Sequence, residues 1–363
     1  MPPILSFVLG TRPEIIKMSP VIRACQDQNV PFSIIHTGQH YSEELDAVFF
    51  KQLDLPTPEH NLSVGSDSHG RQTGEMLGAI ESVLEAESPE TVLVQGDTNS
   101  VLAGAVAASK MDDIDVGHIE AGLRSFDRDM PEEINRRVAD HTSDYLFAPT
   151  ETAREHLRSE GVPDDQITMT GNTVVDAVQQ HVDIAHKRNE IDDDIRTDGQ
   201  FALLTAHRAE NVDDRARFQS LLNGVASAAR EHSLSVVYPI HPRASKRLKE
   251  YDISLPAEIR LVEPQDFLDF LLLEDDATIV FTDSGGVQEE SCILETPCVT
   301  LRDSTERPET VDVGANRVVG VSPSDIVSGA TEMLGVKPTW ANPFGDGTAA
   351  DQILDTLGYG EVS

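Results

Sequence analysis

The hydrophobic positions along the chain fall into short runs rich in β-branched and other apolar side chains, separated by longer segments with helical periodicity. This alternation predicts parallel strands joined by helices. The strands are expected at 4–9, 32–37, 91–95, 145–148, 201–205, 235–239, 259–261, 278–282 and 298–301.

The strands form two series along a chain of 363 residues, which is longer than a single core usually supports. A helix that begins near residue 171, followed by a polar stretch, separates the two series. We therefore predict a first α/β domain over 1–170 and a second over 171–348. A final helix within 349–363 is expected to pack back on the first domain.

Charge and cysteine content narrow the class of protein. The formal charge is −35, so nucleic acid is not an expected partner and an anionic substrate needs a local basic site. The start of the chain lacks a basic region, no apolar run is long enough to span a bilayer, and the 3 cysteines form no Cys-x-x-Cys pair. We expect a cytoplasmic protein with reduced thiols and no membrane partner.

Two neighbouring segments contain many ionisable side chains. They are GHIEAGLR at 117–124 and MPEEINRR at 130–137. Carboxylates, three arginines and glycine or proline turns suit a sugar phosphate better than a hydrophobic core. Glu120 and Glu132 are the carboxylates of interest, and Arg136 can match phosphate oxygens.

A glycine turn follows the first expected strand, where 10–17 reads GTRPEIIK. Thr11 and Glu14 have the spacing of a capping box, and proline suits the first helical turn. The amides at the helix start, together with Arg12 and Lys17, suit an anion. The alternative to an anion site is an ordinary turn that only connects the strand to the helix. The single glycine does not match the dinucleotide fingerprint, so NAD is not indicated.

A second glycine turn follows the expected strand at 278–282, where 283–290 reads DSGGVQEE. Ser284 could cap the next helix, while Gly285 and Gly286 would let phosphates approach closely. Glu289 or Glu290 could accept ribose hydroxyls, so the segment suits a nucleotide diphosphate. A purely structural turn is the alternative. The charge run RDSTERPE at 302–309 follows another strand and adds guanidinium groups, Arg307 among them, or is merely a solvated face.

Further polar groups follow strands at the ends where α/β proteins bind ligands. Asp97 follows the strand at 91–95, although helix capping alone would explain an aspartate there. His207 and His241 each stand beside an arginine after a strand of the second series. A lone histidine is usually structural, but two at equivalent strand ends favour a pyrophosphate or base contact. No cluster of ligands with metal-binding spacing is present, so no metal is expected.

Six motifs, in order along the chain, resemble the non-hydrolysing UDP-N-acetylglucosamine 2-epimerase family. The resemblance implies two Rossmann-like domains with a central cleft, a glycosyltransferase-B-like fold, and a nucleotide held mainly by the second domain. It also implies a homodimer, no cofactor, and a role in surface polysaccharide precursors. The motifs are GTRPE at 10–14, QGDT at 95–98, HIEAGLR at 118–124, PEEINR at 131–136, DSGGVQEE at 283–290 and RDSTERPE at 302–309.

The family reaction implied is reversible C2 epimerisation of UDP-N-acetylglucosamine to UDP-N-acetylmannosamine. The C2 hydrogen is not next to a carbonyl, so UDP leaves first and a 2-acetamidoglucal remains. The resemblance assigns catalytic roles to Asp97, Glu120, Glu132 and His207. It assigns substrate or UDP contacts to Arg12, Lys17, Arg136, His241, Ser284, Gly285, Gly286, Glu290 and Arg307.

One segment departs from the family pattern. Bacterial members commonly carry a Gln-His-x-x-Met-type loop that helps hold a second, activating UDP-N-acetylglucosamine. Here 38–44 reads GQHYSEE, so Gln39 and His40 are retained as possible allosteric contacts while the following residues differ. This departure puts activation by a second substrate molecule in doubt.

Other functions fit parts of this pattern. A relative that acts on a modified UDP-sugar, of the diacetamido uronic acid type, would use the same core. A glycosyltransferase would share the fold but does not explain three gathered carboxylates. A hydrolysing epimerase would release free N-acetylmannosamine, and a sugar-nucleotide sensor would not need proton-transfer groups.

The acidic composition predicts a salt-adapted protein. Self-repulsion among 63 acidic groups destabilises the compact chain at low ionic strength. Concentrated salt screens it, because the Debye length falls to about 3 Å at 1 M. We expect the thermal unfolding midpoint to rise as potassium chloride is added, as followed by circular dichroism. A midpoint that does not rise would contradict salt adaptation.

Overall fold

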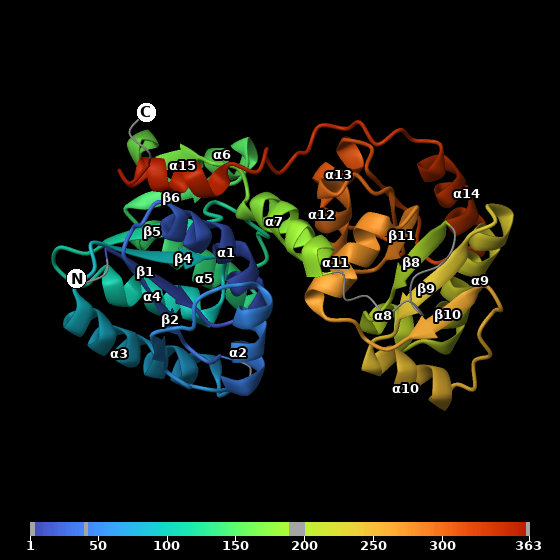
Figure 1. Ribbon diagram of the computed structural model, residues 1–363, viewed down its shortest axis with the longest axis horizontal. Helices are drawn as coiled ribbons and strands as arrows, with labels where there is room; N and C mark the ends of the chain where they lie inside the picture. Colours follow the sequence, from blue (N-terminus) through green and yellow to red (C-terminus); the bar gives the residue numbers. More distant parts are fainter. Residues whose placement is uncertain (1–3, 40–42, 189–199, 361–363) are drawn as a thin grey trace. The chain divides into compact units, whose positions relative to one another are not determined.

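The chain forms two compact units, one comprising Met1–Ala177 with Phe344–Ser363 and the other Val178–Pro343. The computed structural model describes residues 4–39, 43–188 and 200–360. The predicted boundary near residue 171 lies just before helix α7 (Thr173–Arg188), whereas the division into units falls within that helix. Figure 1 shows the course of the chain through its strands and helices.

The first unit is built on a parallel sheet of seven strands in the order β3-β2-β1-β4-β5-β6-β7. The order reverses between β1 and β4, so the crevice at the carboxyl ends of these two strands is the place where such folds bind ligands. The strands are β1 (Leu5–Leu9), β2 (Phe32–His36), β3 (His60–Asn61), β4 (Thr91–Gln95), β5 (Asp115–Ile119), β6 (Tyr145–Ala148) and β7 (Ile167–Met169).

The second unit has a parallel sheet of six strands in the order β10-β9-β8-β11-β12-β13. Its order reverses between β8 and β11, which places the equivalent crevice at their carboxyl ends. The strands are β8 (Phe201–Thr205), β9 (Ser235–Pro239), β10 (Ile259–Val262), β11 (Ile279–Thr282), β12 (Cys298–Thr300) and β13 (Asn316–Val318).

The nine expected strands are all present, and four strands were not expected: β3, β5, β7 and β13. Three of these are short and lie at or near sheet edges, so they carry little apolar signal. The fourth, β5, corrects the interpretation of 117–124 as one polar turn-rich segment. Gly117, His118 and Ile119 are strand residues buried in the middle of the sheet, and the turn begins only at Glu120.

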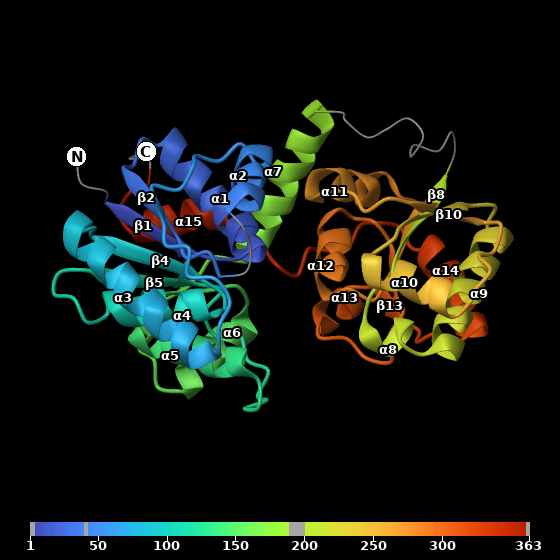
Figure 2. The same ribbon diagram turned by 90° about the horizontal axis from the view of Figure 1, so that it is seen from below.

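Helices pack on both faces of the first sheet. Figure 2 shows α3 (His69–Glu87), α4 (Asn99–Ala108) and α5 (Pro131–Thr142) on one face, and α1 (Arg12–Asp27) with α15 (Ala349–Thr356) on the other. The remaining helices of this unit are α2 (Glu43–Gln52), α6 (Glu151–Ser159) and the short 3₁₀ turn Asp164–Gln166.

Helix α4 lies against the two strands that flank the reversal of strand order. A Cβ added at Gly104 would come within 3.0 Å of both Val8 Cγ1 and Val94 Cγ1, so glycine permits this close approach. The alanines on either side of Gly104 are buried in the same core as these valines. The helix therefore begins immediately beside the carboxyl end of β4, where Thr98 caps it by accepting from Val101 N.

The second sheet carries its own core and helices. Helices α9 (Arg215–Glu231) and α14 (Pro323–Leu334) pack side by side, and α11 (Phe267–Asp276) packs against α12 (Gly285–Ile293). The core includes Leu204, Phe218, Tyr238 and Phe281, all essentially inaccessible to solvent. The other helices are α8 (Ala209–Val212), α10 (Pro242–Glu250) and α13 (Pro308–Asp312).

The cysteines and the helix lengths can be compared with what the sequence led us to expect. The three cysteines, Cys25, Cys292 and Cys298, are all free and buried. No helix in the described part of the chain is long and apolar enough to cross a bilayer.

Candidate active site

The turn between β1 and α1 is filled by the carboxylate of Glu14. Its Oε2 accepts hydrogen bonds from the backbone N–H groups of Gly10 and Thr11, each 2.7 Å long, and its Oε1 accepts from the Thr98 hydroxyl. The capping box predicted from the sequence is therefore present. Glu14 occupies the N–H groups of Gly10 and Thr11, so these two amides do not take part in the anion site expected at this helix start.

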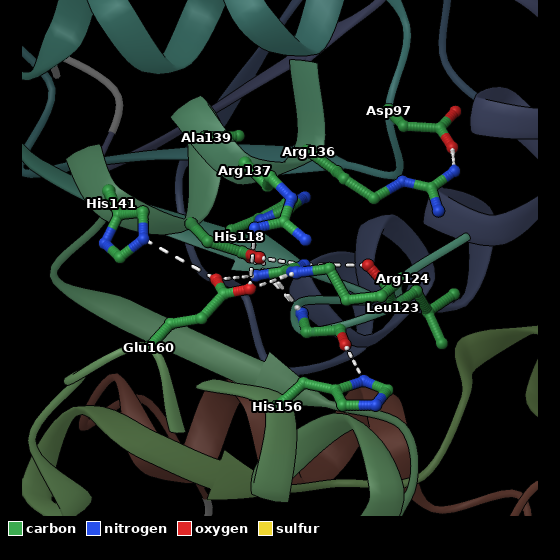
Figure 3. Close-up of polar contacts among 12 residues, drawn as sticks. Asp97, His118, Leu123, Arg124, Arg136, Arg137, Ala139, His141, His156 and Glu160 are labelled. Carbon is green, nitrogen blue, oxygen red and sulfur yellow. Dashed lines mark hydrogen bonds and ion pairs between the residues drawn. The ribbon is translucent and has the colours of Figure 1, made fainter. Parts of the chain in front are cut away.

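Two ion pairs lie next to this turn, at the carboxyl ends of β4 and β5. The guanidinium of Arg136, from α5, binds the Asp97 carboxylate, as Figure 3 shows. Lys17, from α1, places its Nζ 2.6 Å from Glu120 Oε1. The structure thus brings together four of the residues that the sequence singled out, two acids and two bases from four different elements.

Asp97 is the acid with access to solvent, since its side chain is 34% exposed. Its backbone carbonyl accepts a hydrogen bond of 2.9 Å from Asn135 Nδ2, which fixes the turn. Burial raises the pKa of Asp97, and the charge of Glu120 raises it further, whereas Arg136 and Lys17 lower it. The net pKa lies above the usual value for aspartate, which suits a group that exchanges protons.

Glu120 is held in an unusual backbone conformation with φ of +70°. This left-handed region is costly for a residue that is not glycine and is a mark of functional sites. Besides Lys17, its carboxylate accepts from the side-chain amides of Gln95 and Asn172, the latter at 3.1 Å. The carboxylate orientation is therefore fixed by three donors from three elements.

The neighbouring acids Glu132 and Glu133 have different surroundings. Glu132 is half-buried in the first turn of α5, and no ion pair or hydrogen bond joins its side chain to another described residue. Glu133 is buried and accepts from Ser125 N at 2.9 Å and from Arg137 Nε at 2.8 Å. Glu133 thus serves the loop, and Glu132 is available for a ligand.

In the second unit, Asp283 organises the crevice between β8 and β11. This buried carboxylate accepts from the backbone N–H groups of His207 and Arg208 and from Asn211 Nδ2, at 3.0 to 3.1 Å. It also lies 3.2 Å from His207 Nδ1. Burial raises the pKa of Asp283, but its bonds to His207, Arg208 and Asn211 outweigh burial and hold the pKa below its usual value.

His207 and His241 stand next to each other, with ring centroids 5.6 Å apart. His241 Nδ1 accepts from Arg243 N at 3.1 Å, so its hydrogen must be on Nε2. Burial, the neighbouring His207 and Arg243 all lower the pKa of His241, which agrees with a neutral ring. The two histidines predicted from separate strand ends therefore form one pair.

Ser284, Gly285 and Gly286 open helix α12. Ser284 is the N-cap residue but its side chain makes no capping bond, which corrects the expectation that it caps the helix. A Cβ at Gly285 or Gly286 would meet no atom closer than 3.9 Å. The fold itself therefore does not require these glycines, and an approaching ligand would explain them.

The charged residues near α12 are largely paired. Arg307 Nε lies 2.6 Å from Glu289 Oε1, so Glu289 has an ion-pair partner within the protein. Glu290 is half-buried one residue further on. Arg302 binds Glu306 at 2.6 Å and Glu210 at 3.1 Å, which ties the run at 302–309 to helix α8.

The remaining expected contacts lie around α1 and the segment at 38–44. The Arg12 guanidinium lies over the Phe49 ring, 5.4 Å from its centroid. Gln39 is buried, and its side-chain oxygen accepts from Ser100 Oγ at 2.7 Å and Ser100 N at 3.2 Å. His40 lies outside the described residues. The bonds from Ser100 give the Gln39 side chain a packing role of its own.

Two residues that the sequence analysis left without a role, Glu14 and Asp283, organise the two crevices. Asp283 stands in a quoted motif and directly precedes Ser284, so its place at a strand end was a usable signal. Glu14 had the capping-box spacing, but spacing does not show that Thr98 from a distant segment would donate to it. No group of three or more metal-ligand side chains occurs in the described part of the chain.

Comparison with known proteins identifies the family. The profile of the UDP-N-acetylglucosamine 2-epimerase family matches residues 23–358. The UDP-N-acetylglucosamine 2-epimerase of Methanocaldococcus jannaschii is 51% identical over 364 residues, covering 98% of this chain and 99% of that protein. The chain belongs to the UDP-N-acetylglucosamine 2-epimerase family.

A relative with another sugar in its name is also similar. The UDP-2,3-diacetamido-2,3-dideoxy-D-glucuronate 2-epimerase of Pseudomonas aeruginosa is 39% identical over 352 residues, covering 96% of this chain and 98% of that protein. Family membership therefore leaves the sugar to be decided.

Solved structures agree with this assignment. The M. jannaschii UDP-GlcNAc 2-epimerase superposes with a TM-score of 0.92 at 50% identity, covering 98% of this chain and 99% of that one. Its complex with UDP-GlcNAc and UDP gives a TM-score of 0.81 over the same shares. The glycotransferase of kitacinnamycin shares only the fold, with a TM-score of 0.57 at 10% identity, covering 98% and 94% of the two chains. These likenesses confirm the expected glycosyltransferase-B-like fold class.

Glu14 gives the site a testable pH dependence. Burial raises its pKa from 4.5 to about 7, despite lowering by Thr98 and by the amides of Gly10 and Thr11. A carboxyl with a raised folded-state pKa loses stability as pH rises through that pKa. The shift corresponds to about 3 kcal/mol at about 1.36 kcal/mol per pH unit.

We therefore expect Glu14→Gln to gain up to about 3 kcal/mol relative to the unmodified protein between pH 4.5 and 7. Urea unfolding at constant potassium chloride measures this difference. Glu75→Gln, on an exposed residue of α3, is the control and should show no such trend. If the difference in unfolding free energy between Glu14→Gln and the unmodified protein does not change with pH, the pKa of Glu14 is not raised.

Proposed function

We propose that this protein interconverts UDP-N-acetylglucosamine and UDP-N-acetylmannosamine by inverting C2 of the sugar. The observation that carries the proposal is the pairing of Asp97 with Arg136 beside the pair Glu120 and Lys17, at the strand-order reversal of the first sheet. Family membership and the M. jannaschii relative, crystallised with UDP-GlcNAc and UDP, support the choice of substrate.

Elimination and re-addition are the proposed route. The anomeric C–O bond breaks first, so that UDP leaves with its electron pair; a base then takes the C2 proton, and the electrons of that C–H bond form the C1=C2 double bond. The intermediate is 2-acetamidoglucal. UDP oxygen then re-adds at C1 while a proton is delivered to the opposite face of C2. The route needs more than one acid or base, and it needs stabilisation of positive charge at C1.

The first unit supplies groups of the right kind. Asp97 has a raised pKa and partial exposure, which suits a carboxyl that takes and returns a proton. Glu120 is rigidly held and negatively charged beside Lys17, which suits charge stabilisation or proton transfer. Glu132 is not engaged with other described side chains and completes the set of three acids. Arg136, Lys17 and Arg12 are proposed substrate contacts.

The second unit is proposed to hold UDP. The turn from Ser284 to Gly286 lies at a helix N-terminus, and neither glycine is needed by the fold, which supports close approach of a diphosphate. His207 is oriented by the Asp283 carboxylate and is proposed to act on the leaving or returning phosphate. His241, Glu290 and Arg307 are proposed as further UDP contacts.

The proposal also covers the oligomeric state and the cellular role of the protein. A homodimer in the cytoplasm, supplying a precursor of surface glycans, is what the family resemblance supports. The family resemblance also supports Gln39 and His40 as proposed contacts to an effector. Gln39 in addition accepts a hydrogen bond from Ser100 within the protein's own interior.

A second candidate is epimerisation of a diacetamido uronic acid nucleotide. The 39% identity to the P. aeruginosa enzyme favours testing it, because both substrates share UDP and a 2-acetamido group and differ at C3 and C6. The same proton-transfer groups would serve either sugar.

We expect the protein, incubated with UDP-N-acetylglucosamine in deuterium oxide and concentrated potassium chloride, to form C2-deuterated manno and gluco nucleotides, as followed by NMR. Asp97→Asn, Glu120→Gln and Glu132→Gln should each slow deuterium incorporation by about 10² or more, because a positioned acid or base is lost. Glu155→Gln, at an exposed position of α6, is the matched control.

Each other outcome contradicts the proposal in its own way. Free sugar would indicate hydrolysis, and a requirement for an added acceptor would indicate transfer. Turnover of the diacetamido uronic acid nucleotide in preference to UDP-N-acetylglucosamine would establish the second candidate. No exchange at C2 with either sugar would contradict both epimerase assignments.

A further inference from the structure

His118 is a fully buried histidine whose two ring nitrogens both contact acceptors. Nδ1 lies 2.7 Å from Asp140 Oδ1, and Nε2 lies 2.8 Å from the backbone carbonyl oxygen of Gly96. A carbonyl oxygen can only accept, so Nε2 carries a hydrogen. An ionised carboxylate also accepts, so Nδ1 carries one too, and the ring is an imidazolium cation.

Asp140 is the anion at the centre of this buried cluster. Its Oδ2 lies 2.7 Å from Arg124 Nη1, and both its oxygens lie 3.3 Å from Gly122 N–H, which shares its hydrogen between them. The side chain of Arg124 is buried and lies 2.6 Å from Glu160. Figure 3 shows this pair. Glu160 also lies 3.0 Å from Arg137, so each charge of the cluster has at least one partner of opposite sign.

The groups around His118 and Asp140 favour the charged form of both side chains. Burial by itself would lower the pKa of His118, but Asp140, the Gly96 carbonyl and the charge of Glu120 outweigh it and hold the pKa above its ordinary value. Burial would raise the pKa of Asp140, but His118 and Arg124 outweigh it and hold the pKa below its usual range.

The cluster is attached to the backbone of each segment that carries a proposed catalytic acid. Gly96 directly precedes Asp97, and its N–H donates to the carbonyl of Ile119 at 3.1 Å, directly before Glu120. Gly122 follows Glu120 by two residues. Asp140 lies one helical turn beyond Arg136 on α5, the helix that also carries Glu132.

The two turns held in this way have backbone with positive φ. Gly96 at +86° and Gly122 at +82° adopt it without strain because they are glycines, whereas it is costly for Glu120 at +70°. The Glu120 conformation persists only where the surroundings over-determine it. The bonds from His118 to the Gly96 carbonyl and from Gly122 N–H to Asp140 fix the two turns from opposite sides.

We propose that His118, as an imidazolium, and Asp140 are positioning residues that set the separation of the Asp97 and Glu120 carboxylates in the reaction. The inference rests on the proposed function. A neutral imidazole at 118 donates from only one ring nitrogen, and the single amide nitrogen of a glutamine cannot occupy the positions of both ring nitrogens, so one turn would be released. A displacement of about 1 Å in a catalytic group can cost on the order of 10² in rate.

The test compares His118→Gln with Glu160→Gln. We expect His118→Gln to keep its circular dichroism spectrum and its Kd for UDP, to change KM less than about threefold, and to lose about 10² in kcat. Glu160 touches the outer side of Arg124 but neither turn, so Glu160→Gln should keep kcat within about threefold even if its melting temperature falls. A purely structural role for His118 would give the two variants the same pattern.

A second measurement does not depend on activity. Nitrogen-15 NMR of the unmodified protein should show both ring nitrogens of His118 predominantly protonated at pH 6.5, the ordinary pKa of a histidine. The signal is assigned by its absence in His118→Gln, or by its conversion to a neutral ring in Asp140→Asn. Asp140→Asn should also lose kcat without losing affinity for UDP.

The experiments distinguish a failure of this inference from a failure of the proposed function. A His118 ring that is predominantly neutral at pH 6.5, or full kcat in a folded His118→Gln or Asp140→Asn variant of an active enzyme, would overturn this inference alone. An unmodified protein with no exchange at C2 would overturn the proposed function, and the positioning role with it.

Discussion

The constraint on which the structure depends is the parallel arrangement of both sheets. Parallel strands present all their carboxyl ends at one edge, and a reversal of strand order leaves a crevice there that no crossover helix fills. In the first sheet this crevice lies after β1 and β4, and in the second after β8 and β11. The groups proposed for chemistry follow these strands or their neighbours, including Asp97, Glu120, His207 and Ser284.

Each crevice is lined by charges that the fold must compensate. A buried ion costs several kcal/mol to remove from water, and breaking one partner of a buried pair typically costs about 3–5 kcal/mol. The first unit meets this requirement with linked pairs, since Glu120 has Lys17 and Asp140 has both His118 and Arg124. The second unit uses Asp283, which collects three N–H groups and the His207 ring. Buried charge of this kind fixes loop geometry because every alternative arrangement leaves an ion unpaired.

Much of this organisation was accessible from the sequence. The strands at the centre of each sheet are continuous apolar runs, so they were predicted, and polar residues at their ends marked Asp97, His207 and the Ser284 turn. Strand β5 was missed because Asp115, Gly117 and His118 interrupt its apolar pattern. Its histidine is tolerated in the core only because Asp140, from a helix more than twenty residues later, supplies the counter-charge.

The roles of Glu14 and Asp140 could not have been predicted for the same physical reason. Both are acids whose partners come from distant segments, and the pattern of a single helix shows neither the pairing nor the burial. Local capping-box spacing identified Glu14 as a helix-start residue, but it did not show that Glu14 occupies the amides of Gly10 and Thr11.

The central claim is that the anomeric bond breaks and re-forms in the site that these acids line. Positional isotope exchange tests it most directly, using UDP-N-acetylglucosamine labelled with oxygen-18 at the atom that bridges C1 and the β-phosphate. If UDP leaves and its terminal phosphate rotates before return, the label must appear in non-bridging positions of recovered gluco and manno nucleotides. We predict that this scrambling accompanies epimerisation. Inversion at C2 with the label still wholly at the bridge would contradict the account.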